Sequence, residues 1–363
     1  MNDDRLTALR GLLARERLDA ALLTDPADVR YFSGFRGEDC LLLVSTDRGL
    51  LSGDSRYWVQ AAAEAPGFEL VKAGTGDSVL TDALRAWQGQ DGGDGPPLAL
   101  GFQGERLSYS GHRRLRAAFG GRLRNLGDRV AALRQVKDAG EIAALRAASA
   151  VADAALRAVV ERGLVGRAEV EVAWDIAGAV HDQGAEDVAF PTIVAAGPNG
   201  ALPHAIPGGR VIAAGDLVVI DMGARLDGYH SDITRTLAVG HVGDEQCAVY
   251  DVVLRAQLAG LHAAGGGVAC ADVDAAARRV IDEAGYGECF GHGTGHGVGL
   301  EIHEGPRVAR GVRRPLAAGM TVTIEPGIYL EGRFGVRIED TVVVTDTGCE
   351  PLTAFPKELL VVE

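Results

Sequence analysis

The stretch DLVVIDMGARLDGYHSDITRTLAV, residues 216–239, constrains the fold more than any other part of the chain. Apolar residues flank an Asp-Gly pair at 227–228, which is typical of a two-residue hairpin turn. This turn pairs Gly223 with Asp232, so that Asp221 and Asp232 are diagonal neighbours on one face. Two carboxylates on an apolar hairpin repel each other unless a cation lies between them. The segment therefore predicts a metal site, and the alternative is a solvent-facing strand with surface acids.

A second acidic hairpin is predicted in TVTIEPGIYLEGRFGVRIEDTVVV, residues 321–344. Glu325 and Glu339 are equidistant from Gly332, so they face each other if the turn is centred there. The residues around them are apolar, which indicates a buried hairpin, and lone glutamates are rarely tolerated in such a place. Each hairpin then offers two carboxylates to one site.

The segment FGHGTGHGVGLEIHEGP, residues 290–306, places His292, His296 and His303 among glycines. The glycines make a helix improbable and predict a loop followed by a strand, unlike the helical HExxH pattern of zinc proteases. Taken alone, each histidine is as well explained as an ordinary satisfied polar residue. Together with four carboxylates, one imidazole suits Mn, Co, Zn or Fe, and an oxygen-rich ligand set favours Mn.

The length of 363 residues predicts two domains, and we expect their boundary near residue 130. Residues 1–130 alternate helix and strand signals, which predicts a small α/β domain with a mixed sheet and an exposed loop at 91–97. Residues 131–363 contain an internal echo, since two predicted helices precede each acidic hairpin. Two related αβ halves facing each other would form a cleft.

Composition narrows the classes of function. A net charge of −14 opposes nucleic-acid binding, and no apolar run is long enough for a membrane span. The opening MNDDRLTALR has neither an apolar signal core nor an Arg-rich, acid-poor presequence, so we expect a cytoplasmic protein. Five scattered cysteines without CxxC pairs predict free buried thiols rather than disulfides.

The motifs IDMGARLDGYHSDITRT, HGTGHGVGLEIHE, TIEPGIY and GVRIEDT, in this order, resemble the creatinase, aminopeptidase P and prolidase members of the pita-bread metallopeptidases. The similarity includes YFSGF in the first domain and LRQVKDAGEIAALRAA at the junction. It implies an N-terminal creatinase-type domain that serves dimerisation and substrate access. It also implies a C-terminal pita-bread catalytic domain and hydrolysis of the bond before proline.

Roles of individual residues are implied by the same resemblance. Two divalent ions, Mn or alternatively Zn or Co, would be held by Asp221, Asp232, His296, Glu325 and Glu339. Asp232 and Glu339 would bridge the ions, and Glu325 would be the general base. The substrate would contact His204, His292, His303 and Tyr329, of which His204 and His303 would also move protons. Arg337 would hold the Asp221 carboxylate. Alternatively, Tyr329 is a core residue and Arg337 forms a structural ion pair.

The expected substrate is a proline-containing dipeptide, because no large insertion lies between EPGIY and RIED. Its carboxylate would need a cation: Arg333 at the hairpin tip, or Arg36 or Arg56 from the partner in a homodimer. An aminopeptidase acting on longer Xaa-Pro peptides is the alternative. A creatinase-like amidinohydrolase and a non-catalytic binding module similar to the histone-chaperone relatives are more distant alternatives, and the complete ligand set disfavours both.

Overall fold

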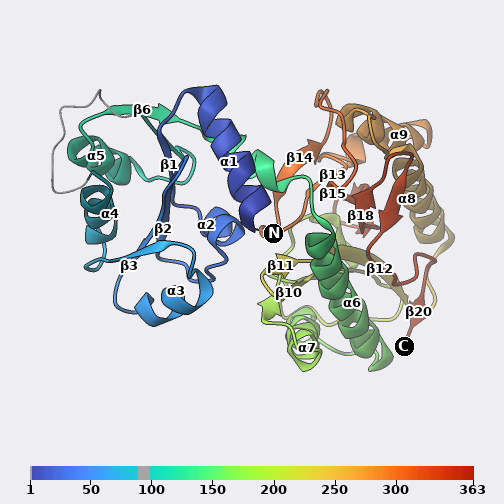
Figure 1. Cartoon of the computed structure of the whole chain (residues 1–363). Coiled ribbons are helices and arrows are strands. Elements are labelled where there is room, and N and C mark those ends of the chain that lie inside the picture. The colour runs from blue at the N-terminus through green and yellow to red at the C-terminus, as the bar shows by residue number, and fades with distance from the viewer. Residues whose placement is uncertain (1, 89–98) are drawn as a thin grey trace. The chain divides into compact units, whose positions relative to one another are not determined.

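The computed structural model describes residues 2–88 and 99–363 (Figure 1). The chain divides between Arg134 and Gln135 into two compact units. Each unit has hydrophobic clusters of its own. The α/β class expected from the sequence is confirmed. The loop predicted at 91–97 lies outside the described residues.

The first unit is a six-stranded mixed sheet with the strand order β4-β3-β2-β1-β5-β6. The strands are β1 (Ala20–Leu23), β2 (Leu41–Ser45), β3 (Gly49–Gly53), β4 (Glu69–Lys72), β5 (Ala99–Phe102) and β6 (Arg122–Asn125). The helices are α1 (Asn2–Glu16), α2 (Pro26–Ser33), α3 (Trp58–Glu64), α4 (Ser78–Gln88) and α5 (Tyr109–Ala118). In Figure 1, α1 and α2 cover one face of the sheet and α4 and α5 cover the other. The central strands β1 and β2 are therefore buried on both faces, which explains their unbroken apolar sequences.

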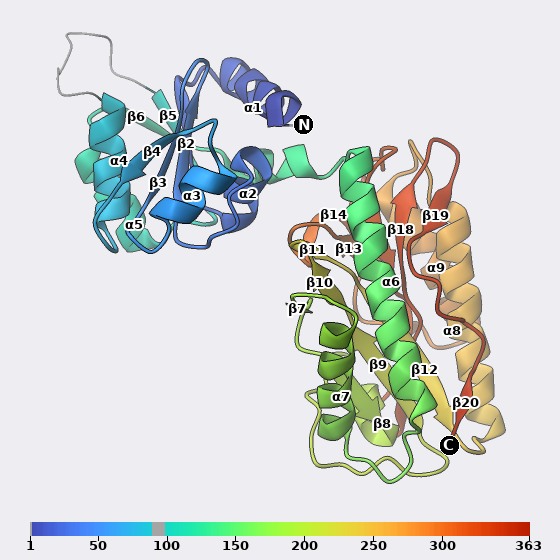
Figure 2. The same ribbon diagram turned by 60° about the horizontal axis from the view of Figure 1, so that its bottom comes forward.

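The second unit repeats one pattern twice, because a pair of helices precedes each acidic hairpin, as the sequence predicted (Figure 2). The helices are α6 (Ala139–Glu161), α7 (Glu169–Asp182), α8 (Asp244–Ala263) and α9 (Cys270–Glu283). Helix α6 begins with a capping box, in which Asp138 and Glu141 each accept a hydrogen bond from the other's backbone amide. α6 and α7 pack against the strands of the first half, and α8 and α9 pack against those of the second.

The strands of the second unit form two larger sheets and two small ones. One sheet has the order β20-β12-β9-β8, with β8 (Ile193–Ala196), β9 (Leu217–Met222), β12 (Ile233–Val239) and β20 (Val361–Val362). The other has the order β14-β13-β15-β18-β19, with β13 (Gly295–Gly297), β14 (Glu304–Val308), β15 (Thr321–Ile324), β18 (Asp340–Val344) and β19 (Cys349–Pro351). The small sheets contain β7 (Asp187–Val188), β10 (Ala224–Leu226) and β11 (Tyr229–His230), and β16 (Gly327–Leu330) with β17 (Phe334–Arg337).

The first acidic hairpin has the predicted register. Asp227 and Gly228 have φ angles of 47° and 67°, so both turn residues are left-handed, as a type I′ turn requires. The pairs Arg225↔His230 and Ile233↔Met222 lie on either side of Asp232 and place it opposite Gly223. A side chain at Gly223 would collide with the Ser231 carbonyl, which explains the glycine there.

The second hairpin also has the predicted register, but it is not one continuous ladder. β16 pairs with β17, and beyond them β15 pairs with β18 in a different sheet. The pairs Gly327↔Arg337 and Ile324↔Asp340 continue one register, in which Glu325 is opposite Glu339. Pro326 has no backbone N–H, so the ladder is interrupted next to the two glutamates.

Candidate metal centre

Three predicted ligands, from three different strands or their ends, meet in the second unit. Asp232, His296 and Glu339 each offer one atom, and these atoms lie within 4.8 Å of one another. The His296 Nε2 atom is 3.5 Å from an oxygen of Asp232 and 3.5 Å from an oxygen of Glu325. Asp221 is close enough for its charge to influence both Asp232 and Glu339. The structure thus gathers all five predicted ligands.

His296 presents one nitrogen to the acids. Its Nδ1 atom lies 2.9 Å from the Gly297 carbonyl, which fixes Nδ1 as the donor and leaves the Nε2 lone pair facing the carboxylates. Burial lowers the pKa of His296 to about 4. The imidazole is therefore neutral at pH 7, which is the form that binds a metal ion.

The carboxylates are crowded in a region of low solvent access. Asp232 and Glu339 are 5% and 2% exposed. Burial and neighbouring carboxylates raise the pKa of both groups well above the ordinary value. Burial also raises the pKa of Glu325 to about 7, although Arg337 acts in the opposite direction. These acids can all be ionised at neutral pH only if cationic charge is added.

The donor set fits a divalent metal ion. Arg337 donates to Oδ2 of Asp221 at 2.6 Å, whereas Oδ1 of Asp221 is buried without a hydrogen-bond partner in the described part of the chain. A buried carboxylate oxygen without a partner is costly unless a cation uses its lone pairs. Four carboxylates and one imidazole nitrogen supply the oxygen-rich coordination that Mn or a similar ion prefers.

A chain of polar contacts connects a predicted pocket histidine to a metal-facing acid. The Tyr329 hydroxyl lies 2.9 Å from His292 Nε2 and also accepts a hydrogen bond of 2.9 Å from Arg337. Arg337 in turn binds Asp221. Burial lowers the pKa of His292 to about 4, so this ring is neutral. Its Nδ1 atom lies 2.8 Å from the Gly293 carbonyl, so Nδ1 is the donor and Nε2 accepts a hydrogen bond from the Tyr329 hydroxyl.

The other predicted pocket residues differ in their placement. The His303 and His296 rings have centroids 4.5 Å apart, and His303 is exposed. His204 is exposed and close enough to His292 to help lower its pKa. Arg333 is at the exposed hairpin tip and forms an ion pair with Glu245, with one contact of 3.0 Å. It does not pair with the predicted metal ligands in the described chain. Its substrate role remains a prediction.

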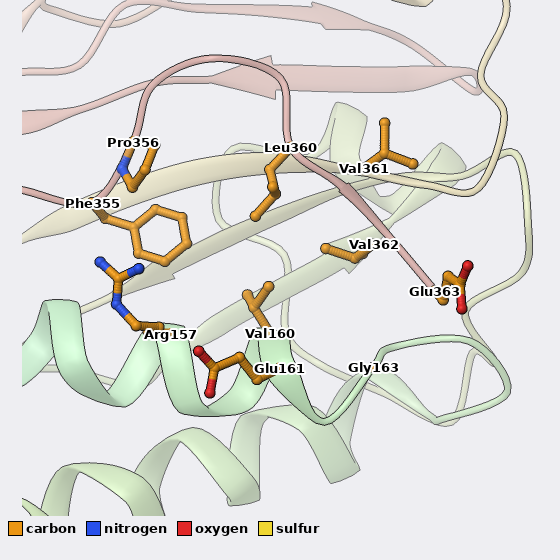
Figure 3. Close-up of a pocket in the computed structure, with 10 residues that line it drawn as sticks. All are labelled: Arg157, Val160, Glu161, Gly163, Phe355, Pro356, Leu360, Val361, Val362 and Glu363. Carbon is orange, nitrogen blue, oxygen red and sulfur yellow. The ribbon is translucent and has the colours of Figure 1, made fainter.

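A separate cavity of about 370 Å³ lies in the second unit between the end of α6 and residues 355–363 (Figure 3). Its lining is largely apolar, with Phe355, Leu360 and Val362 among the contributors. None of the predicted site residues lines it. The chemistry expected from the sequence is therefore located at the acidic cluster and not in this cavity.

Comparison with known proteins identifies the family. Residues 143–346 match the model of metallopeptidase family M24, and residues 5–136 match that of the creatinase/prolidase N-terminal domain. The chain belongs to metallopeptidase family M24. The resemblance to the pita-bread metallopeptidases is thereby confirmed, and so is the expected fold.

Relatives of this M24 metallopeptidase include proteins named dipeptidases and a protein named an aminopeptidase. The Xaa-Pro dipeptidase of Pyrococcus furiosus is 36% identical, over 98% of this chain and 99% of the relative. The structure of an Xaa-Pro dipeptidase from Bacillus anthracis is 38% identical, covers 100% of both chains and has a TM-score of 0.94. An X-Pro aminopeptidase from Thermotoga maritima is 39% identical, covers 98% of this chain and 99% of its own, and has a TM-score of 0.89.

Two polar groups around the centre of this M24 metallopeptidase were not predicted. The Thr234 hydroxyl donates to Glu339 at 2.7 Å and lies 3.1 Å from Nε of Arg337. Its position two residues after Asp232, on the same strand face, was a usable signal. The second group is an ion pair between Asp274 and Arg278 on α9.

The Asp274–Arg278 pair secures the loop that carries the predicted histidines. Arg278 donates to the Phe290 carbonyl at 2.9 Å and to the His292 carbonyl at 2.7 Å. Asp274 accepts hydrogen bonds from the backbone and the hydroxyl of Thr294. The sequence signal was an acid and a base four residues apart on the apolar face of a helix.

A search of the helices in the described ranges found none with the length and hydrophobicity of a membrane-spanning segment.

Proposed function

We propose that this M24 metallopeptidase hydrolyses the peptide bond before proline, with a preference for Xaa-Pro dipeptides. The observation that carries the proposal is the largely buried cluster of four carboxylates around one neutral imidazole, in which one Asp221 oxygen finds no hydrogen-bond partner among the described residues. Membership of the family, together with relatives that are named Xaa-Pro dipeptidases, supports Xaa-Pro peptides as the substrate class. In this proposal, two ions are bound by Asp221, Asp232, His296, Glu325 and Glu339.

The ligands differ in their proposed roles. Asp232 and Glu339 would each bind both ions, since they are the most deeply buried of the acids and both approach His296. Mn is the favoured metal because carboxylate oxygens dominate the ligand set, and Zn and Co are the alternatives. Arg337 keeps Asp221 oriented through their 2.6 Å contact.

Bound together, two divalent ions lower the pKa of a water molecule and polarise the scissile carbonyl. Glu325 acts as the general base and then as the general acid, because its side chain is 18% exposed, the most of the four acids, so that water and substrate can reach its carboxylate. It takes the proton of the attacking water and passes it to the proline nitrogen as the C–N bond breaks. His204 and His303, both exposed beside the cluster, assist proton movement at that nitrogen.

The nitrogen of an Xaa-Pro bond carries no hydrogen and cannot donate to the enzyme. Specificity must then come from the shape of the pocket and from contacts to carbonyl or carboxylate oxygens. His292, His303 and Tyr329 provide these contacts in our proposal. The hydrogen bonds between His292, Tyr329 and Arg337 keep the pocket fixed relative to Asp221.

Peptide length distinguishes a dipeptidase from an aminopeptidase. We expect kcat/KM for Xaa-Pro to exceed that for Xaa-Pro-Yaa at least about tenfold, because a dipeptidase gains one charge-assisted contact to the proline carboxylate. A panel of matched dipeptides and tripeptides measures this ratio. Comparable turnover of tripeptides would favour aminopeptidase activity, for which the Thermotoga relative is named.

The cation for that carboxylate is proposed to be Arg333, which would have to exchange Glu245 for the substrate. Arg36 or Arg56 of a partner subunit is the alternative. Arg56 is already bound to Asp54 at 2.8 Å and to Asp39 at 2.9 Å, so it too would have to exchange a partner. We propose a homodimer in which the N-terminal domain, residues 1–130, shapes substrate access to the catalytic domain, residues 131–363.

Removal of metal tests the proposal as a whole. We expect exhaustive chelation to reduce Xaa-Pro hydrolysis to background and added Mn²⁺ to restore it, because Arg337, the cation beside the cluster, is already bound to Asp221 and Tyr329 and cannot replace the ions at the carbonyl. Rates before chelation, after chelation and after reconstitution provide the measurement. Undiminished hydrolysis by protein shown to be metal-free would contradict the proposal and reopen the creatinase-like and non-catalytic alternatives.

The location that we propose is the cytoplasm. All five cysteines lie in the described ranges and are free thiols, as is usual for proteins of that compartment.

A further inference from the structure

Glu339 is held at three points by two consecutive residues of β12. Its backbone amide donates to the Thr234 carbonyl at 3.1 Å, and its carboxylate accepts from the Thr234 hydroxyl at 2.7 Å. Its own carbonyl accepts a short hydrogen bond from Nη1 of Arg235. Asp232 is joined to the same region, because the Thr341 hydroxyl donates to its carbonyl at 2.9 Å. The two acids that we propose as bridging ligands therefore lie on backbones that are bound to each other.

Arg235 reaches this region from the interior. It is 1% exposed, and its guanidinium also contacts the carbonyls of Thr234, Phe355 and Pro356. Nη2 of Arg235 lies 2.8 Å from Oδ1 of Asp340, the residue that follows Glu339. The N–H donors of a guanidinium lie in one plane, and those of Arg235 are all engaged by carbonyl and carboxylate oxygens. The group therefore has one orientation, and this orientation fixes the position of the Glu339 carbonyl.

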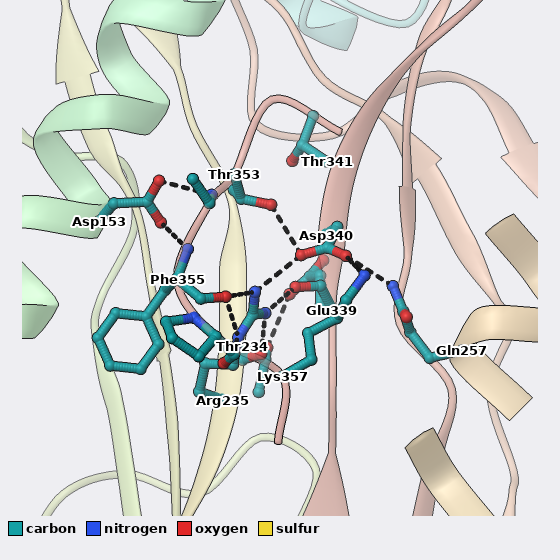
Figure 4. A network of polar contacts seen from close by, with 12 residues as sticks. Asp153, Thr234, Arg235, Gln257, Glu339, Asp340, Thr341, Thr353, Phe355 and Lys357 are labelled. Atoms are coloured by element: carbon teal, nitrogen blue, oxygen red, sulfur yellow. Dashed lines mark hydrogen bonds and ion pairs between the residues drawn. The ribbon is translucent and has the colours of Figure 1, made fainter. Parts of the chain in front are cut away.

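Asp340 is the centre of the polar network shown in Figure 4. Besides Arg235, its carboxylate accepts from the Thr353 hydroxyl at 2.8 Å, from Gln257 at 2.9 Å and from Nζ of Lys357 at 2.6 Å. Four donors thus saturate a carboxylate that is 1% exposed. Two of the donors, Thr353 and Lys357, belong to the segment that follows β19.

We infer that Lys357, acting through Asp340 and Arg235, is a positioning residue for the metal centre. This inference rests on the proposed function. Lys357 neutralises and orients Asp340, Asp340 orients Arg235, and Arg235 holds the backbone of Glu339 against β12. The last segment of the chain therefore helps to set the separation of the Asp232 and Glu339 carboxylates before any ion binds.

A purely structural role would be a different claim. Buried ion pairs often contribute little net stability, because desolvation of the charges offsets their attraction. What distinguishes this network is where its hydrogen bonds end, since Arg235 donates to Glu339 itself. Groups that orient a metal ligand typically change metal affinity 10–100-fold when they are removed. Metal affinity is therefore the property to measure.

The experiment compares Mn²⁺ binding to metal-free protein by titration calorimetry, without substrate. We expect Lys357→Met to weaken binding at least about tenfold and Lys357→Arg to recover most of the affinity, because arginine restores the charge beside Asp340. The matched control is Arg167→Met. Arg167 also forms a 2.6 Å ion pair, with Asp175, and its side chain is 22% exposed, as is that of Lys357. We expect this control to bind Mn²⁺ like the wild type.

The outcomes are separable. If Lys357→Met and Arg167→Met lose similar melting temperature and both keep wild-type Mn²⁺ affinity, the positioning role is wrong while the proposed function stands. A wild type that binds none of Mn²⁺, Zn²⁺ and Co²⁺ would instead overturn the proposed function and this inference with it. Should Lys357→Met fail to fold, Gln257→Met removes a neutral donor to Asp340, and we expect several-fold weaker binding. Unchanged affinity in Gln257→Met would then overturn the inference.

Discussion

Asparagine at position 232 is expected to lower kcat/KM for Xaa-Pro hydrolysis by at least about 10³-fold while the protein remains folded. Asp232 offers an oxygen that lies within 4.8 Å of ligand atoms of both His296 and Glu339, and we propose that it binds both ions. Loss of a direct ligand should exceed the 10–100-fold cost typical of residues that only orient one. Steady-state kinetics with saturating Mn²⁺, together with circular dichroism, provides the measurement.

Asp227→Asn is the matched control for this substitution. It makes the same chemical change at the exposed tip of the same hairpin, where φ is 47° and asparagine is well tolerated. We expect wild-type kinetics from it. If Asp232→Asn kept more than about a tenth of the activity with bound metal, Asp232 would not be a bridging ligand.

Both acidic hairpins could be predicted from the sequence because their registers depend on local chemistry. Asp227 and Gly228 both adopt positive φ, which only a few residue types tolerate, so the turn specifies the pairing of the strands. Centring the second hairpin on Gly332 gave Glu325 opposite Glu339 in the same way. Once the registers are known, the side of each strand follows from the alternation of side chains.

What could not be predicted depends on packing between distant segments. Strand alternation places Thr234 on the same face as Asp232, but no local pattern specifies Glu339, 105 residues away, as its partner. The same holds for Lys357 and Asp340, which are 17 residues apart. The split of the second hairpin into two sheets also depends on other segments, since β15 pairs with β13 and β18 pairs with β19, whereas β16 and β17 pair only with each other in the described chain. In the first unit, α2, α5 and β6 have weak sequence signals because they are short or only partly apolar.

Glutamine at position 325 is expected to have two effects of opposite sign at pH 8. Hydrolysis should fall to background, because a neutral amide can neither take the proton of the water nor bind a metal ion strongly. The metal-free protein, however, should become more stable than the metal-free wild type. In the wild type, burial disfavours the charge of ionised Glu325 and Asp221 repels it, and neutral glutamine removes this charge.

The pH dependence follows from the raised pKa of Glu325, which is about 7 compared with an ordinary value of 4.5. A carboxyl group whose pKa rises on folding contributes stability that is present below pH 4.5 and is lost as the pH rises to 7. At about 1.4 kcal/mol per unit, Glu325→Gln should therefore gain about 3 kcal/mol over the metal-free wild type at pH 8 and almost nothing near pH 4.5.

Urea unfolding of both metal-free proteins at pH 5 and pH 8 measures this difference. Saturating Mn²⁺ should reverse the order of stability at pH 8, because the ions stabilise the folded wild type in proportion to their affinity and bind the variant less tightly. Equal stabilities of the metal-free proteins at pH 8 would mean that neither burial nor Asp221 disfavours the charge of Glu325. The electrostatic argument for a metal ion beside these acids would then lose its support.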